Sequence, residues 1–365
     1  MSANQPLNQY KIFNKSCYGL TDIKDNSLDA VITDPPYGIS YQNNYWDKDL
    51  PDKKIWNDCI KKLKPGAFGA VFSSVRLMHR LMVDLEDSGF IIKDVLFWVY
   101  LNGMPKSRNI ALDIDKELGV ESKKNGIYKY VQGYKKDGAE SYKNRYAKDK
   151  FEPASELGML FKGEGLGVKP AYEPIILVQK EIEKGLTVAQ NIVKHKTGAL
   201  NIEQTRIPYE RGESKVGHNP HPHGRVTSNI LRTDTFIDGY DKFFTVPKVR
   251  QHADDFNNHP TLKPIELMHH LVKLLTWENQ IVLDPFMGSG STGLSALILG
   301  RKFYGYELDK NYFQIAEKRF ENIEQKLSIP TLFEPTTAYE KRRKLKNNGI
   351  RKSKTTLNGH KAARR

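Results

Sequence analysis

The chain has 365 residues, of which 39% are hydrophobic and 10% aromatic, enough for one large domain with insertions or for two domains. This composition excludes general disorder, and the longest apolar stretch, residues 95–101, is far shorter than the ~20 residues that span a bilayer. The opening residues lack a secretory signal, and Cys17 and Cys59 form no CxxC motif. We therefore expect a globular protein in a reducing, cytoplasmic setting, without a membrane segment.

The net charge of +14 is concentrated near the end of the sequence. Residues 336–365 carry eleven Lys and Arg residues against one acid, Glu340, so this segment supplies +10 of the total. Such a basic run attracts polyanions by counterion release. It is equally typical of a disordered, solvating tail, and the sequence leaves both interpretations open.

Short apolar runs alternate with helical patterns over the first hundred residues. Helices are predicted near residues 54–63 and 75–88, and strands at residues 10–13, 28–33, 69–73 and 95–100. This alternation predicts an α/β fold with a doubly wound, mostly parallel sheet.

The middle of the chain interrupts the alternation. Over residues 103–163 the periodicity disappears and Lys, Tyr, Gly and Asp dominate. A strand at residues 174–178 marks a return to the core over residues 164–182, and a second polar segment, rich in Gly, Pro and His, covers residues 183–257. We interpret the two polar segments as insertions.

The regular pattern resumes at Pro264, which suits the first turn of a helix whose apolar positions run to Leu275. A strand at residues 281–283 leads into the glycine-rich turn DPFMGSGSTG, a helix follows to Leu299, and another strand covers residues 303–306. The sequence therefore predicts a strand, glycine turn, helix and strand unit.

The glycine turn satisfies the GxGxxG pattern with Gly288, Gly290 and Gly293. Glu307 follows the last glycine by fourteen residues, at the end of the next strand, a spacing that suits an acid that binds ribose hydroxyls. No Lys follows the last glycine as a Walker loop requires, so a nucleoside triphosphate site is not expected. A nicotinamide cofactor stays formally open.

Asp284 and Pro285, directly before the glycines, favour one cofactor class. We expect the Asp284 carboxylate to point into the cofactor crevice, where it would repel a pyrophosphate but tolerate the positive sulfonium and ammonium of S-adenosylmethionine. The structural alternative is a tight turn with a Ser that caps the following helix.

A second motif, Asp34-Pro35-Pro36-Tyr37, follows the strand predicted at residues 28–33, where open α/β sheets bind ligands. An exocyclic amine of a base is a poor nucleophile, so a site must accept its hydrogens as a methyl group arrives. Asp34 and the carbonyl group of Pro35 can be the two acceptors, and Tyr37 offers a face on which a flipped base stacks. Taken alone, DPPY could also be an ordinary turn.

Together these motifs resemble the amino-group DNA methyltransferases of the permuted β class, in which DPPY precedes the cofactor motif. The resemblance covers most of residues 10–325, through SLDAVITDPPYGI, LKPGAFGAVFSS, GMPKSRNIA, KPAYEPIILV, HPTLKP, DPFMGSGSTG and YGYELD. It implies a Rossmann-like, circularly permuted S-adenosylmethionine-dependent fold. On this interpretation residues 1–102, 164–182 and 258–335 form the catalytic domain, and residues 336–365 are a basic tail.

The resemblance also implies roles for individual residues. Asp34, Pro35, Pro36 and Tyr37 are expected to hold the target base, and residues 259–264 to cover the methionine end of the cofactor. Where relatives often carry Gly-Asp after the first strand, this chain has Asn14-Lys15-Ser16, so the contact expected of Asn14 is in doubt. The residues predicted to bind the cofactor are Asn14, Thr261, Lys263, Asp284, Pro285, Phe286, Gly288, Ser289, Gly290, Ser291, Thr292 and Glu307.

The two insertions resemble target-recognition regions. In residues 128–146, Lys and Arg alternate with Tyr, which suits phosphate contacts and stacking, although an exposed polar loop explains the composition as well. His218, His221 and His223 suggest a metal, but without a carboxylate or Cys partner we expect none. The residues predicted to contact DNA are Lys106, Ser107, Lys135, Lys136 and Arg145.

We therefore predict methyl transfer from S-adenosylmethionine to the N6 amine of adenine in double-stranded DNA, because the DPPY spelling goes mostly with adenine in this family. The alternatives are an N4-cytosine enzyme, a protein or RNA methyltransferase, a non-catalytic DNA-binding protein and, on GxGxxG alone, an oxidoreductase. The family also raises a cognate restriction endonuclease and a homodimer as partners, neither of which the sequence identifies.

Overall fold

The computed structural model describes residues 9–40, 45–100, 109–131, 145–168, 170–209, 221–232, 244–245 and 262–327. The chain divides into two compact units. Unit 1 comprises Met1–Val99 and Glu173–Arg365, and unit 2 comprises Tyr100–Tyr172, a wider span than the predicted insertion at 103–163. In the described segments, no helix combines the length and apolar character that crossing a membrane demands.

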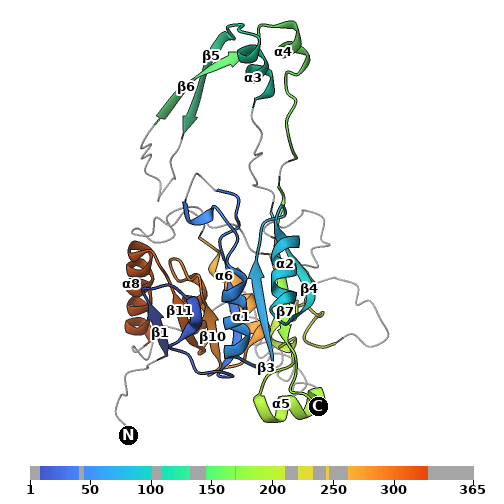
Figure 1. Ribbon diagram of the computed structural model, residues 1–365, viewed down its shortest axis with the longest axis vertical. Coiled ribbons are helices and arrows are strands. Elements are labelled where there is room, and N and C mark those ends of the chain that lie inside the picture. Colours follow the sequence, from blue (N-terminus) through green and yellow to red (C-terminus); the bar gives the residue numbers. More distant parts are fainter. Residues whose placement is uncertain are drawn as a thin grey trace, which may run out of the picture. The chain divides into compact units, whose positions relative to one another are not determined.

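The strands of unit 1 form one sheet in the order β1-β11-β10-β2-β3-β7-β4-β8-β9 (Figure 1). Strand β7 runs antiparallel to β3, whereas the pairs β1–β11, β11–β10, β10–β2, β2–β3, β4–β8 and β8–β9 are parallel. This confirms the predicted α/β fold with a mostly parallel sheet and a permuted chain order. The strands are β1 (Tyr10–Phe13), β2 (Leu28–Thr33), β3 (Leu63–Phe72), β4 (Phe90–Val99), β7 (Tyr172–Lys180), β8 (Ile230–Arg232), β9 (Phe244–Thr245), β10 (Ile281–Asp284) and β11 (Lys302–Tyr306).

Helices cover both faces of this sheet, as a doubly wound fold requires. On one face, α1 (Lys53–Lys62) and α2 (Met78–Asp87) bury their apolar side chains in a core with Val31 of β2 and Leu283 of β10. On the other, α6 (Ile265–Leu275) contacts β2 and β3, and α7 (Ser291–Ile298) contacts β10 and β11. The last helix, α8 (Lys310–Leu327), packs on α7, beside β1 and β11 in Figure 1.

Strand β2 is the centre of the arrangement. All six of its residues are buried, as expected for a central strand covered on both faces. Asp29 is the polar exception at its start: it accepts hydrogen bonds from Lys64 Nζ (2.6 Å) and from the backbone N–H of Ile281 (2.8 Å). The buried carboxylate thus fixes the starts of β2, β3 and β10, and with them the positions at which these strands end.

The segment predicted as a second insertion contributes to the main sheet. It contains α5 (Val188–His195), which packs on β3, a short helical turn η4 (Glu203–Thr205), and the strands β8 and β9. Strands of three and two residues are too short to show a period in the sequence, which explains why they were not predicted.

Unit 2 is also more regular than predicted. It contains α3 (Ile110–Glu117), an antiparallel ribbon of β5 (Lys123–Val131) and β6 (Arg145–Glu152), and α4 (Glu156–Leu160). Asp115 is fully buried and accepts hydrogen bonds from Ser122, Ala154 and Ser155, which hold the pKa of its carboxyl at about 2. Its buried carboxylate therefore ties α3 to one end of the ribbon, where the start of β5 pairs with the end of β6.

Candidate active site

Two Asp-Pro pairs lie at the same edge of the sheet. Asp34 directly follows β2, Asp284 ends β10, and the two strands are parallel neighbours. Because the carboxyl ends of parallel strands meet at one edge, residues 250 positions apart share a site. Both carboxylates line one cavity of about 430 Å³.

The cavity brings most of the predicted residues together. Pro35, Tyr37, Gly290 and Asn14 are not among its lining residues. Trp46, Asp49 and Tyr312 line it without having been predicted. The predicted residues that line it are Asp34, Pro36, Lys263, Asp284, Pro285, Phe286, Gly288, Ser289, Ser291, Thr292 and Glu307.

Asp34 is presented to the cavity by two donors. The Tyr37 hydroxyl donates to Oδ1 (2.7 Å), and the Lys263 ammonium donates to Oδ2. Desolvation raises the pKa of the Asp34 carboxyl, while Lys263 and Tyr37 oppose that shift. The side chain keeps 22% exposure, so its oxygens remain within reach of a ligand in the cavity.

Lys263 lines the cavity, and its predicted contact with the methionine end of a cofactor stays a prediction. Its ammonium pairs with Asp34 and lies 3.5 Å from Glu173 Oε2 on β7. Burial lowers the pKa of Lys263, but the two carboxylates outweigh it and raise the pKa above its ordinary value. Sequence analysis missed Glu173, although it lies within the KPAYEPIILV segment.

Asp47 holds the turn after Asp34. Its carboxylate accepts hydrogen bonds from the backbone N–H groups of Tyr37 (2.5 Å) and Gly38 (3.1 Å), and its carbonyl oxygen accepts one from Ser40. Asp47 is 2% exposed, and Gly38 has a φ of 67°, which glycine adopts without strain. A lone Asp ten residues after the motif gives no signal in the sequence.

Asp284 is held by neutral donors instead. Its oxygens accept hydrogen bonds from the hydroxyls of Thr33 and Thr292, both 2.6 Å long, and from the N–H of Phe286 (3.1 Å). The residue is 2% exposed, and desolvation raises the pKa of its carboxyl to about 7 against these hydrogen bonds. The carboxylate lies in the cavity wall and joins β2 to α7, and its predicted contact with a cofactor stays a prediction.

Two of the three glycines are required by packing. A Cβ at Gly293 would lie 2.4 Å from the Phe320 ring and 2.6 Å from the Phe303 ring. Gly290 has a φ of 81°, and a Cβ there would also meet Phe320, at 2.7 Å. The glycines therefore let α8 and β11 pack closely on the turn, and their contact with a cofactor stays a prediction.

Glu307 supports the same turn from β11. Its carboxylate accepts hydrogen bonds from the N–H of Gly288 (2.9 Å) and of Asp309 (2.7 Å), and burial raises its pKa. Each carboxylate oxygen has capacity for a second hydrogen bond. Asn14 donates to the carbonyl oxygens of Glu307 (2.9 Å) and Leu308 (3.3 Å), so it fixes this backbone from outside the cavity lining.

Several predicted residues lie outside the described part of the chain. They are Thr261, for the cofactor, and Lys106, Ser107, Lys135 and Lys136, for DNA. Arg145 is the first residue of β6.

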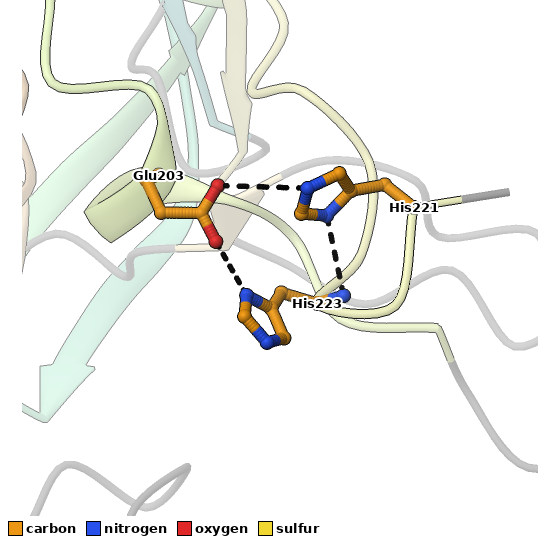
Figure 2. A group of neighbouring side chains, drawn as sticks. All are labelled: Glu203, His221 and His223. Atoms are coloured by element: carbon orange, nitrogen blue, oxygen red, sulfur yellow. Dashed lines mark hydrogen bonds and ion pairs between the residues drawn. The ribbon is translucent and has the colours of Figure 1, made fainter.

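A carboxylate does accompany two of the histidines considered as metal ligands. In Figure 2 the two carboxylate oxygens of Glu203, in η4, face the imidazoles of His221 and His223. Arg206 Nε donates a hydrogen bond to Glu203 Oε2 (2.7 Å). His221 Nδ1 accepts a hydrogen bond from the backbone N–H of His223 (3.3 Å). A neutral His221 ring therefore carries its proton on Nε2, the atom that faces Glu203. Hydrogen bonds therefore satisfy the carboxylate, and these contacts connect the 221–225 segment to η4. His218 lies outside the described residues.

A comparison with known families identifies the chain. The DNA methylase family model N6_N4_Mtase matches residues 28–318, which include both Asp-Pro motifs and the whole cavity-lining glycine turn. The chain belongs to this family. It is a DNA methyltransferase of the N6/N4 group, as predicted from its motifs.

Curated relatives of this DNA methyltransferase agree with that assignment. It is similar to the Type II methyltransferase M.HindIII of Haemophilus influenzae, with 29% identity over 84% of this chain and 94% of the relative. It is also similar to the DNA adenine methyltransferase YhdJ of Escherichia coli, with 30% identity over 41% of this chain and 45% of the relative.

Solved structures of similar architecture include two methyltransferases. The M1.HpyAVI–SAM complex shares 20% identity over 85% of this chain and 98% of its own, with a TM-score of 0.43. The cytosine-N4-specific PvuII DNA methyltransferase shares 16% identity over 88% of this chain and 90% of its own, with a TM-score of 0.48. At these values the likeness carries no argument about the base that this DNA methyltransferase modifies.

Proposed function

We propose that this DNA methyltransferase transfers a methyl group from S-adenosylmethionine to the N6 amine of adenine in double-stranded DNA. The observation that carries the proposal is the Asp34 carboxylate, held by Lys263 and Tyr37 at the wall of the cavity that Asp284 and Glu307 also line. The Asp at the first position of DPPY and the adenine methyltransferase among the relatives support adenine over cytosine.

The cavity suits the cofactor in size and charge. Its volume of about 430 Å³ falls within the ~300–1,000 Å³ typical of small-molecule sites. Glu307 can accept hydrogen bonds from ribose hydroxyls with the free lone pairs of its oxygens. Asp284, with a pKa of about 7, becomes ionised when a cation binds beside it, which favours a sulfonium over a pyrophosphate. When bound, the cofactor supplies an electrophilic methyl group.

The Asp34 side of the cavity suits an amine. A carboxylate accepts hydrogen bonds only, so Asp34 can take one hydrogen of an exocyclic amine while the carbonyl group of Pro35, beyond the end of β2, takes the other. Tyr37, whose hydroxyl is fixed on Asp34, keeps its ring for stacking. The base must leave the duplex to reach this edge, which is why we propose base flipping.

We further propose that unit 2 reads the DNA. Its β5–β6 ribbon has the dimensions that a major groove accepts, and the sequences of the two strands hold six basic residues against two acids. Several relatives, among them M.HindIII and M.HpaI, are Type II methyltransferases, which supports a role in restriction–modification. A cognate endonuclease and a homodimer stay predictions.

The test is nucleoside mass spectrometry on plasmid DNA from a methylation-deficient host that expresses the protein, beside a host that expresses Asp34→Asn. N6-methyladenine is expected in the first sample alone. N4-methylcytosine would keep the mechanism and overturn the choice of base. Neither product, from protein that is folded and binds S-adenosylmethionine, would contradict the proposed DNA substrate.

A further inference from the structure

A buried cation connects two carboxylates beside the cavity. Lys263 is 8% exposed, and its ammonium contacts Asp34, Glu173 and, at 3.4 Å, the Tyr37 hydroxyl. The ammonium also lies 5.0 Å from the Phe72 ring centroid and 5.6 Å from that of Tyr37. Its three hydrogen-bond donors are thus directed at the residues around Asp34.

This geometry assigns Lys263 a task other than binding the cofactor. A carboxylate that must accept a hydrogen bond from a weakly acidic amine has to be ionised and fixed in direction. Desolvation at this edge of the sheet opposes ionisation of Asp34, and a fixed ammonium opposes the desolvation. Glu173, 3.5 Å from the same ammonium, gives it a second carboxylate partner and keeps the three charges at a net −1.

We propose that Lys263 is a positioning residue for methyl transfer, whose ammonium, anchored by Glu173, orients the Asp34 carboxylate as the acceptor of the target amine. The proposal rests on the proposed role of Asp34 and holds for either base. It differs from the cofactor role expected of the HPTLKP segment, because it places the effect of Lys263 on the amine side of the cavity.

Among the described residues, the charged and titratable groups that act on Asp34 are Lys263, Glu173, Tyr37 and Asp284. Replacing Lys263 with Met leaves three acids and a phenol there, so the pKa of Asp34 rises and the carboxylate loses one of its two fixed donors. Replacing Glu173 with Gln at the same time removes one repelling charge. The single and double variants therefore form a cycle in which the second change offsets part of the first.

The experiment measures initial rates of tritium transfer from S-adenosylmethionine to phage DNA from a methylation-deficient host, between pH 5.5 and 9. At pH 7 we expect Lys263→Met to lower kcat about 100-fold, the cost of a misplaced catalytic group. Its acid limb should move up by about one to three pH units, the shift that an opposite charge at ~4–6 Å produces. Raising the pH above 7 should therefore increase the kcat of this variant, whereas the kcat of wild type should change little.

Two matched variants separate positioning from folding. Lys263→Arg keeps the cation and is expected to keep the wild-type acid limb. The double variant Lys263→Gln with Glu173→Gln preserves the net charge of the site. It replaces Lys263→Met in the same rate and pH measurements if Lys263→Met does not fold. Calorimetry with S-adenosylmethionine should give wild-type affinity for each folded variant.

The result that overturns the proposal is a Lys263→Met enzyme with weakened S-adenosylmethionine binding and an unmoved acid limb, because that would place Lys263 on the cofactor. The failure of the proposed function is distinguishable. If Asp34→Asn retains activity, the acceptor role of Asp34 is wrong. If Asp34→Asn is inactive while Lys263→Met has the rate and pH profile of wild type, only the role of Lys263 is wrong.

Discussion

Asp34-Pro35 and Asp284-Pro285 are the same dipeptide at the ends of neighbouring parallel strands, yet the protein treats their carboxylates in opposite ways. Asp284 is 2% exposed and accepts hydrogen bonds from two threonine hydroxyls and one backbone N–H. Asp34 keeps 22% exposure and is held by a buried ammonium and a phenol. Asp284 is therefore buried in the cavity wall, whereas Asp34 is partly exposed to the cavity.

The partners explain the difference. Neutral donors fix a carboxylate without favouring its charge strongly enough to offset burial, so the pKa of Asp284 rises to about 7 and the group serves mainly to join β2 to α7. Burial raises the pKa of Asp34 as well, but there a cation with its own counter-ion opposes the rise and directs a partly exposed carboxylate. Mutation of the two aspartates should therefore affect different properties.

The largest expected effect is on catalysis at Asp34. Asp34→Asn keeps the size of the side chain but turns an acceptor edge into a donor, so we expect kcat to fall by about 10³-fold, within the range for losing a catalytic proton acceptor. Affinity for S-adenosylmethionine, measured by calorimetry, should be unchanged. If a folded Asp284→Asn variant is equally inactive, the two aspartates do not differ in function as proposed.

The next effect is the pH dependence of stability at Asp284. Its folded pKa of about 7 lies above the ordinary 3.8, so between these values the folded state binds a proton that the unfolded state lacks, and stability falls as pH rises. Relative to Asp284→Asn, wild type should lose up to about 4 kcal/mol of unfolding free energy from pH 4 to pH 7, as an order of magnitude. Urea unfolding without cofactor measures this slope, and parallel curves for the two proteins would contradict it.

A smaller effect tests the glycine turn as a packing element. Gly293→Ala places a methyl group 2.4 Å from the Phe320 ring, so we expect a loss of about 1–3 kcal/mol in unfolding free energy from overpacking. The matched control is Gly167→Ala, where a Cβ meets no atom within 4 Å and the backbone is not in the left-handed region. A Gly293→Ala protein no less stable than this control in urea would show that α8 can move away without cost.

The smallest effect concerns the donors on Asp34. Tyr37→Phe removes one hydrogen bond to Oδ1 and keeps the ring, so kcat should fall only about 2–10-fold, equivalent to a net ~0.5–1.5 kcal/mol. Tyr37→Ala also removes the stacking face and should cost more. Equal rates for the two variants would exclude stacking of the base on Tyr37.

Patterns local in sequence predicted much of the fold. Strand β2 has the predicted bounds because most of its residues are apolar, as in a parallel strand that is buried on both faces. Strand β3 begins at Leu63, six residues before the prediction, because Pro65 and Gly66 obscure the run. Helix α3 lies in a segment predicted to lack regular structure, since a short amphipathic helix among Lys and Tyr shows little contrast.

In the site, too, local sequence patterns were recognised and contacts between distant residues were not. The two strand-end motifs were recognised because each is contiguous in the chain. Lys263 was recognised, but its contact with Asp34 was not predicted, and Glu173, Thr33 and Asp47 were missed. Their partners are distant along the chain or in a polar loop, and only the packing of the sheet defines them.

The bond between Thr33 and Asp284 joins residues 251 positions apart in the sequence, and β1 similarly pairs with β11. During synthesis on the ribosome, the stretch between Thr33 and Asp284 takes ~10–50 s to emerge at roughly 5–20 residues per second. Over that time the apolar strand β2 lacks its neighbour β10, and its open edge is a target for chaperones or for aggregation. A chain that stops before β10 has the DPPY motif but not the glycine turn, so incomplete translation products cannot methylate DNA.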